Sequence, residues 1–198
     1  MFPLGTVLLP GAVLPLHVFE PRYRQLVEDC LAGQPEFGVV LIERGSEVGG
    51  GETRFDVGTA ARIVQAGRLD DGRYVLVTVG ERRVRVARWL PDDPYPRAEV
   101  EALDDRPAAI DPDRIAGSVR ALRRVLALRA ELGLPSAVDV ALDDDPTRAS
   151  FEACGLAALG PLDAQRLLEL DDTAARLTRL EALLDDQAAL LELRLGDS

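Results

Sequence analysis

Few residues of this chain could act as nucleophiles or as acid–base catalysts. His17 is the only histidine, and it lies within the apolar segment Val13–Val18. A Ser–His or Cys–His arrangement would have to use it, and the only cysteines, Cys30 and Cys154, lie far apart in apolar, helix-like sequence. We therefore predict two small core thiols in a reducing compartment, and no charge-relay chemistry at His17.

The chain contains no lysine, because all 23 basic residues are arginine. A Walker A loop needs a lysine on the β and γ phosphates, so a standard P-loop is excluded. A Ser–Lys dyad and a lysine Schiff base are excluded for the same reason. The composition thus removes three common kinds of catalytic centre.

Ligands for a metal ion are scarce in the sequence. With one histidine and two distant cysteines, a zinc site would need Asp or Glu to complete four ligands. The acidic runs Asp143–Asp145 and Asp185–Asp186 are adjacent carboxylates without the separation that paired acid–base work needs, and we interpret them as helix caps and solvated faces. We expect no catalytic residue, no metal and no cofactor.

The formal net charge is -11, and both halves of the chain are acidic. This balance counts against nucleic acid and anionic membranes as partners. Arg82, Arg83 and Arg85 nevertheless form a local basic strip that could bind an anion. Their alternation with Val84 and Val86 favours a solvated strand face as the simpler explanation.

Patterns in the first half predict a β-rich lobe with one helix. The expected strands are Thr6–Leu9 and Val13–Val18 around a turn at Pro10–Gly11, then Phe37–Ile42, Val57–Ile63, Tyr74–Val79 and a further strand after a return at Gly80. A helix is expected from Pro21 to Gly33. Strands at this spacing suggest a small barrel.

Beyond residue 106 the hydrophobic period changes from two to 3.6, which predicts helices. The expected helices begin after the cap Asp111 and run to Gly133, from Pro146 to Leu159, from Leu162 to Leu170 and from Thr173 to Leu195. The fold class is therefore α+β, with a β-rich lobe over residues 1–106 and a helical lobe over residues 107–198. No stretch is long and apolar enough for a spanning helix, and no signal peptide is evident, so we expect a cytoplasmic protein.

The opening segment resembles a known family. The motifs are Phe2-Pro3-Leu4, Pro10-Gly11 and the run from Pro15 to Tyr23, PLHVFEPRY; they look like the start of the substrate-binding domain of Lon proteases. Similar stretches follow at Phe37–Val40, Val57–Ala60, Asp71–Arg73 and Gly80–Val86, and more weakly at Ala164–Leu168 and Arg176–Leu191. The resemblance implies a PUA-like β-barrel followed by a helical bundle.

The resemblance also implies a non-catalytic module that binds peptides or proteins. Such a module could be an adaptor or holding factor for unfolded or client polypeptides, working with a separate protease. An exposed groove would be formed by Pro10, Pro15, His17, Phe19 and Tyr23, although turn and core packing explain the same residues. An RNA-binding or nucleotide-binding PUA-like protein that uses Arg82, Arg83 and Arg85 is the alternative function.

The leucine stripe of the last predicted helix could mediate self-association. Leu177, Leu180, Leu184 and Leu191 lie on one face of that helix. A broad apolar stripe of this kind can pair with the same stripe of a second copy. A homo-oligomer formed through the C-terminal helix is therefore a further expectation.

Overall fold

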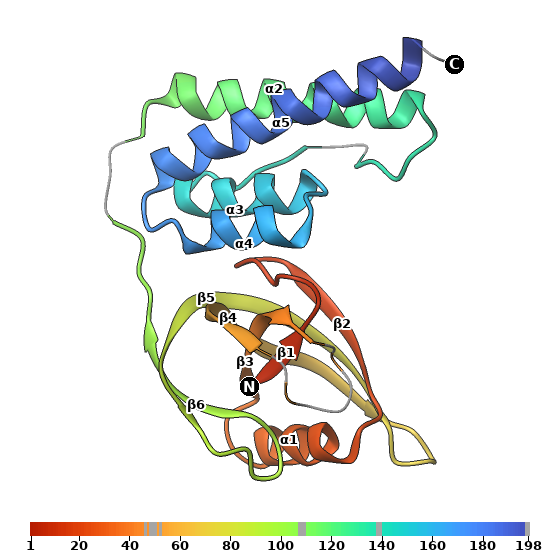
Figure 1. Ribbon diagram of the computed structural model, residues 1–198, viewed down its shortest axis with the longest axis vertical. Coiled ribbons are helices and arrows are strands. Elements are labelled where there is room, and N and C mark those ends of the chain that lie inside the picture. The colour runs from red at the N-terminus through yellow and green to blue at the C-terminus, as the bar shows by residue number, and fades with distance from the viewer. Residues whose placement is uncertain (46, 48–50, 52, 107–109, 138–139, 197–198) are drawn as a thin grey trace. The chain divides into compact units, whose positions relative to one another are not determined.

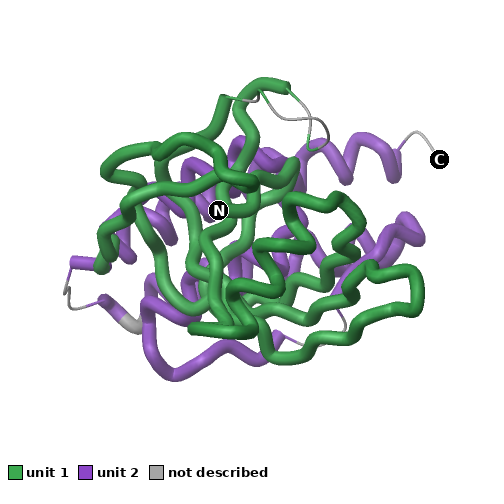
Figure 2. The backbone as a smooth tube through the Cα atoms, turned by 90° about the horizontal axis from the view of Figure 1, so that it is seen from below, with its two compact units in different colours: residues 1–104 green, residues 105–198 purple. Residues whose placement is uncertain are grey.

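The computed structural model describes residues 1–45, 47, 51, 53–106, 110–137 and 140–196. The chain forms two compact units, residues 1–104 and residues 105–198, which Figure 2 colours separately. The division falls two residues before the predicted boundary. Residues 107–109, where the helical lobe was predicted to begin, lie outside the described residues.

The first unit is a six-stranded sheet with one helix. Its elements are β1 (Phe2–Leu4), β2 (Val13–Val18), α1 (Pro21–Ala32), β3 (Glu36–Arg44), β4 (Thr53–Arg68), β5 (Tyr74–Leu90) and β6 (Arg97–Ala102). The strand order is β1-β3-β4-β5-β2. Strand β6 pairs with residues 84–90 of β5, further along that strand than the residues 74–79 that pair with β2. Long strands β4 and β5 bend strongly in Figure 1. No pairing among the described residues joins β1 to β2, so closure into a PUA-like barrel stays a prediction.

Two expectations for this unit are wrong. The predicted strand Thr6–Leu9 is not a strand, because the Leu8 carbonyl accepts the Thr59 hydroxyl at 2.5 Å and the Leu9 carbonyl accepts the Ala12 N–H at 3.1 Å in the turn. The sheet instead gains β1, which runs parallel to β3.

The predicted chain reversal at Gly80 is also absent. Tyr74–Leu90 is one continuous strand with a bulge at Glu81, where Ala61 faces Gly80 and Ala60 faces Arg82. A Cβ atom on Gly80 would lie 2.4 Å from the Leu9 carbonyl oxygen. The glycine therefore allows the segment before Pro10 to pass close to β5 and does not make a turn.

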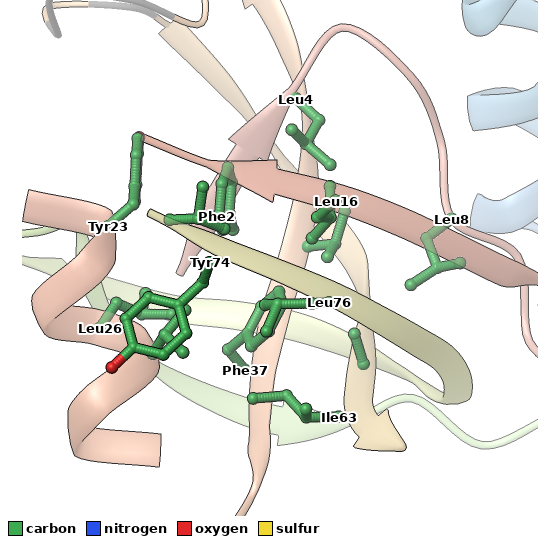
Figure 3. Close-up of a cluster of buried hydrophobic side chains, with 14 residues drawn as sticks. Phe2, Leu4, Leu8, Leu16, Tyr23, Leu26, Phe37, Ile63, Tyr74 and Leu76 are labelled. Carbon is green, nitrogen blue, oxygen red and sulfur yellow. The ribbon is translucent and has the colours of Figure 1, made fainter. Parts of the chain in front are cut away.

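The core of this unit lies between the sheet and α1. Tyr23, Leu26 and Val27 are the buried residues of α1. They pack into one apolar cluster with strand residues that include Phe2, Leu16, Phe37 and Leu76 (Figure 3). Pro21 lies in the first turn of α1, where its fixed φ angle already has a helical value.

The second unit contains four helices: α2 (Pro112–Glu131), α3 (Pro146–Leu156), α4 (Pro161–Glu169) and α5 (Thr173–Gly196). Asp111 and Asp145 cap α2 and α3 by accepting the backbone N–H groups of Asp113 and Arg148. Helices α2 and α5 pack side by side in Figure 1. The predicted leucine stripe of α5 is buried within this unit, whereas Leu190 and Leu193 on α5 are exposed. Self-association stays a prediction.

A buried arginine organises the second unit. Arg176 on α5 is fully buried and pairs with Asp105. It also donates to the Ser150 hydroxyl at 2.8 Å and to the Leu170 carbonyl at 2.6 Å, and its guanidinium carbon lies 3.7 Å from the centre of the Phe151 ring. One side chain thus ties α3, α5 and the segment after α4 to the first residue of the unit.

No helix within the described part of the chain is long and apolar enough to cross a membrane.

Candidate functional site

A surface hollow of about 210 Å³ lies in the first unit beside the strands β1 and β2. Its lining comes from both strands, from the start of α1 and from one distant residue: Phe2, Leu4, Pro15, Leu16, His17, Val18, Phe19, Glu20, Tyr23 and Glu47. Strands β1 and β2 stand at opposite ends of the strand order. The hollow therefore lies beside the two strands that end the strand order.

Aromatic stacking shapes the apolar part of the hollow. The Phe2 and Tyr23 rings are stacked, with centroids 4.2 Å apart and an interplanar angle of 9°, and Phe37 lies 5.7 Å from Phe2. All three side chains are buried and belong to the cluster drawn in Figure 3. The amino group of Met1 donates to the Pro96 carbonyl at 2.7 Å, and burial lowers the pKa of this amine to about 6. These contacts fix the short strand β1.

Charged residues form the rim of the hollow. Glu20 accepts the Arg22 guanidinium at 3.1 Å, and Arg22 also donates to the Glu47 backbone carbonyl at 3.4 Å and lies 4.5 Å from the centre of the Tyr23 ring. The Glu47 carboxylate accepts the Gly5 backbone N–H. The guanidinium thus pairs with the Glu20 carboxylate alone, and the Glu47 carboxylate leaves this side of the hollow weakly acidic.

The structure brings four of the five predicted peptide-binding residues to this hollow. Pro15, His17 and Phe19 are exposed, with 55% of Phe19 accessible, whereas Tyr23 is buried. Pro10 does not line the hollow and lies in the turn with Gly11, whose φ is +82°.

The remaining lining residues were not predicted as site residues: Phe2, Leu4, Leu16, Val18, Glu20 and Glu47. Glu47 comes from a distant segment that no local pattern connects to β2. Val13 does not line the hollow, but it is 63% exposed and extends the outward row of β2. The alternation of β2 could have identified Val13, because Leu16 and Val18 point inward and the odd-numbered residues point out.

The arginine strip of β5 is not one continuous solvated face. Arg82 forms a two-pronged ion pair with Glu36, at 3.0 and 2.6 Å, which holds the pKa of Glu36 below its usual range. Arg83 is buried and donates to the Asp104 carbonyl at 3.3 Å, so its assignment to a solvated face is wrong. Arg85 is exposed. The three guanidinium groups therefore lie in three different environments, and anion binding by this strip stays a prediction.

The residues that could do chemistry are not gathered at the hollow. His17 lies there, but Cys154 is buried in α3 of the other unit, where desolvation raises the pKa of its thiol to about 12. Half-buried Cys30 in α1 donates to the Glu36 carbonyl at 3.2 Å, and burial raises its pKa as well. In the described ranges, no group of three His, Cys, Asp or Glu side chains is arranged to hold a metal ion. The arrangement is suited to binding an apolar group.

Within the described residues, fold and site together define a mixed α+β protein with a curved sheet, five helices and a hollow beside β1 and β2. The sequence model of the ATP-dependent protease La (LON) substrate-binding domain matches residues 1–186, so the chain belongs to that family. The chain is 30% identical to the Lon protease of Cytophaga hutchinsonii over an alignment that covers 95% of the chain and 24% of that protein. It is also 30% identical to the Lon protease of Anaeromyxobacter dehalogenans over an alignment that covers 96% of the chain and 23% of that protein. The chain thus spans about a quarter of the length of these curated relatives.

Solved structures give the same result for the fold. The crystal structure of a Lon N-terminal domain protein from Xanthomonas campestris superposes with a TM-score of 0.69 at 32% sequence identity, covering 91% of this chain and 95% of that one. The N-terminal domain of the Mycobacterium avium complex Lon protease gives a TM-score of 0.60 at 21% identity over 94% of both chains, which supports the fold alone. The resemblance seen in the opening motif is confirmed.

Proposed function

We propose that this chain is a non-catalytic module that recognises unfolded or client polypeptides through the hollow between β1 and β2. Membership of the LON substrate-binding family gives the class of partner. The observation that carries the proposal is the position of Pro15, His17 and Phe19, which are all exposed on the rim of an apolar hollow. An exposed phenylalanine beside buried aromatic rings gives an apolar ligand a surface to cover.

The size of the hollow sets the kind of contact. About 210 Å³ is enough for one or two apolar side chains and well below the 300–1,000 Å³ of a typical small-molecule pocket. A polypeptide that inserts single side chains fits this volume. Delivery of the bound chain to a separate protease, as an adaptor or holding factor, is part of the same proposal.

Binding of a permanently unfolded protein tests the function. Fluorescein-labelled, reduced and carboxymethylated α-lactalbumin is titrated with the wild-type chain and followed by anisotropy. Saturable binding is expected, and Phe19→Ala should weaken it about fivefold to tenfold, because covering the exposed part of a phenylalanine contributes about 1–1.5 kcal/mol.

The matched control is Val100→Ala, because Val100 is 44% exposed on β6 and does not line the hollow. This variant should bind as the wild type does. Absence of saturable binding by the wild type both to α-lactalbumin, which is acidic, and to a basic unfolded protein, reduced and carboxamidomethylated ribonuclease A, would refute the proposed function. Equal losses for the two variants would place the binding surface elsewhere.

A further inference from the structure

The direction of the backbone groups of β2 follows from its pairing with β5. Gly80 N–H donates to the Ala12 carbonyl at 3.0 Å, and the register continues as Leu14↔Thr78, Leu16↔Leu76 and Val18↔Tyr74. In an antiparallel pair, bonded and non-bonded positions alternate, so these even-numbered residues bond to β5. The N–H and C=O groups of Val13 and His17 and the C=O of Pro15 therefore point away from β5.

The other side of β5 supports this assignment independently. Leu69 N–H donates to the Arg73 carbonyl at 2.8 Å, and the register then pairs Gly67 with Val75 and Gln65 with Val77. Odd-numbered residues of β5 thus bond to β4, which leaves its even-numbered residues for β2. Pro15, opposite Val77, stands where a missing N–H costs no ladder bond.

The outer edge of β2 is unoccupied within the part of the chain that the structure describes. Strand β2 ends the strand order, and no backbone bond reaches Val13, Pro15 or His17 from that side. Pro15 and His17, whose backbone groups point to this edge, line the hollow together with Leu16 and Val18. A free edge of this kind is a template for an extended chain, which supplies the missing backbone partners.

The features of this edge favour a foreign peptide over a second copy of the chain. Two copies paired through β2 would each bring a proline without an N–H donor to the middle of the new ladder. Each copy also carries a net charge of -11, so two copies repel. Glu20 and Glu47 on the rim favour an apolar segment with basic residues beside it.

We infer that the polypeptide recognised in the proposed function binds as an added strand on the outer edge of β2, with alternate apolar side chains inserted into the hollow. This inference rests on the proposed function and adds how the polypeptide binds. Because the backbone makes the shared contacts, the site accepts many sequences that can extend and that place apolar residues at every second position.

Backbone methylation of a peptide tests the mode. The probe is a fluorescein-labelled nonapeptide that alternates leucine and threonine between arginine residues, and single N-methyl groups are placed along it in turn. Methylation at positions whose N–H faces β2 should weaken binding at least tenfold, and methylation at the positions between them should change it less than twofold. Loss of binding should therefore alternate along the peptide.

Two variants at one position test the protein side. His17→Ala removes the side chain and keeps the outward N–H, whereas His17→Pro removes the N–H as well, at a position that does not bond to β5. His17→Pro should bind the nonapeptide at least tenfold more weakly than His17→Ala. The N-methyl series uses the wild-type chain, so it decides the question even if His17→Pro does not fold.

The outcomes separate the mode from the function. If the nonapeptide binds and methylation at every position has the same small effect, strand addition is overturned while the proposed function stands. If neither the nonapeptide nor either of the two unfolded proteins binds, both are overturned. A wild-type dimer that His17→Pro dissociates would show that a second copy occupies the edge, and this would also overturn the inference.

Discussion

Replacing Arg176 should destabilise the helical unit more than replacing an exposed arginine of the same unit. Arg176 is fully buried, and the side chain of its partner Asp105 is only 16% exposed. Removal of one member of a buried, hydrogen-bonded ion pair costs about 3–5 kcal/mol, because the remaining charge is left in a poorly solvated place. We expect Arg176→Met to lose about 4 kcal/mol of unfolding free energy.

Urea unfolding followed by two probes measures this loss in the relevant unit. Circular dichroism at 222 nm reports mainly the helices, and fluorescence of the single tryptophan, Trp89 on β5, reports the first unit. With an m-value of about 1.3 kcal/mol/M for a unit of this size, the dichroism midpoint should fall by about 3 M. The fluorescence midpoint should move less if the units unfold independently.

Arg179→Met is the matched control on the same helix. Arg179 is 44% exposed and lies 3.8 Å from Asp163, so its removal should change the unfolding free energy by less than about 0.5 kcal/mol. Arg176→Lys keeps the charge but not the guanidinium donors, and should fall between the two. If Arg176→Met unfolds within about 1 kcal/mol of Arg179→Met, the buried pair does not organise the unit as argued.

Two further predictions concern buried positions. Burial raises the pKa of the Cys154 thiol in the folded chain from an ordinary 9.0 to about 12. The thiol therefore loses its proton at a lower pH in the unfolded chain than in the folded chain. Its contribution to stability is present below pH 9 and is lost between pH 9 and 12. Over that range the unfolding free energy of Cys30→Ser should fall by up to about 4 kcal/mol relative to that of Cys30→Ser/Cys154→Ala. A thiolate absorbance at 240 nm that titrates near pH 9 in folded Cys30→Ser would contradict this. Gly58→Ala should cost more than about 2 kcal/mol, because its Cβ would lie 2.1 Å from the Val39 oxygen, whereas Gly67→Ala, with 3.9 Å to the Val75 oxygen, should be nearly neutral. Urea unfolding followed by Trp89 fluorescence compares the Gly58→Ala and Gly67→Ala variants. Equal unfolding midpoints would contradict this prediction.

The sequence predicts those elements whose signals are local. Asp111 with Pro112, and Asp145 with Pro146, mark the starts of α2 and α3 because a cap and its proline act within one turn. The inward and outward faces of β2 follow from alternation alone. These signals place most of the candidate site on the correct strand.

Features that depend on contacts between distant residues could not be predicted in this way. The pairing of Phe2 with Val39 creates β1, and nothing in a three-residue stretch indicates a parallel partner so far along the chain. Arg83 was expected to be solvated because it alternates with apolar residues, but the segment at Leu103 and Asp104 bonds to it and covers it. For β1 a tertiary contact creates an element without a local signal, and for Arg83 a tertiary contact overrides a local pattern.

The candidate site shares residues with the core, and this decides how its function can be tested. Phe2 and Tyr23 shape the hollow but are also stacked and buried in the main apolar cluster. Substitution of Tyr23 by alanine would remove a buried aromatic ring, which typically costs 3–5 kcal/mol, so loss of binding in that variant would not separate recognition from unfolding. Phe19 and His17 line the same hollow and are exposed. Their side chains can be changed with little effect on stability, so loss of binding in variants of Phe19 or His17 would report on recognition and not on unfolding.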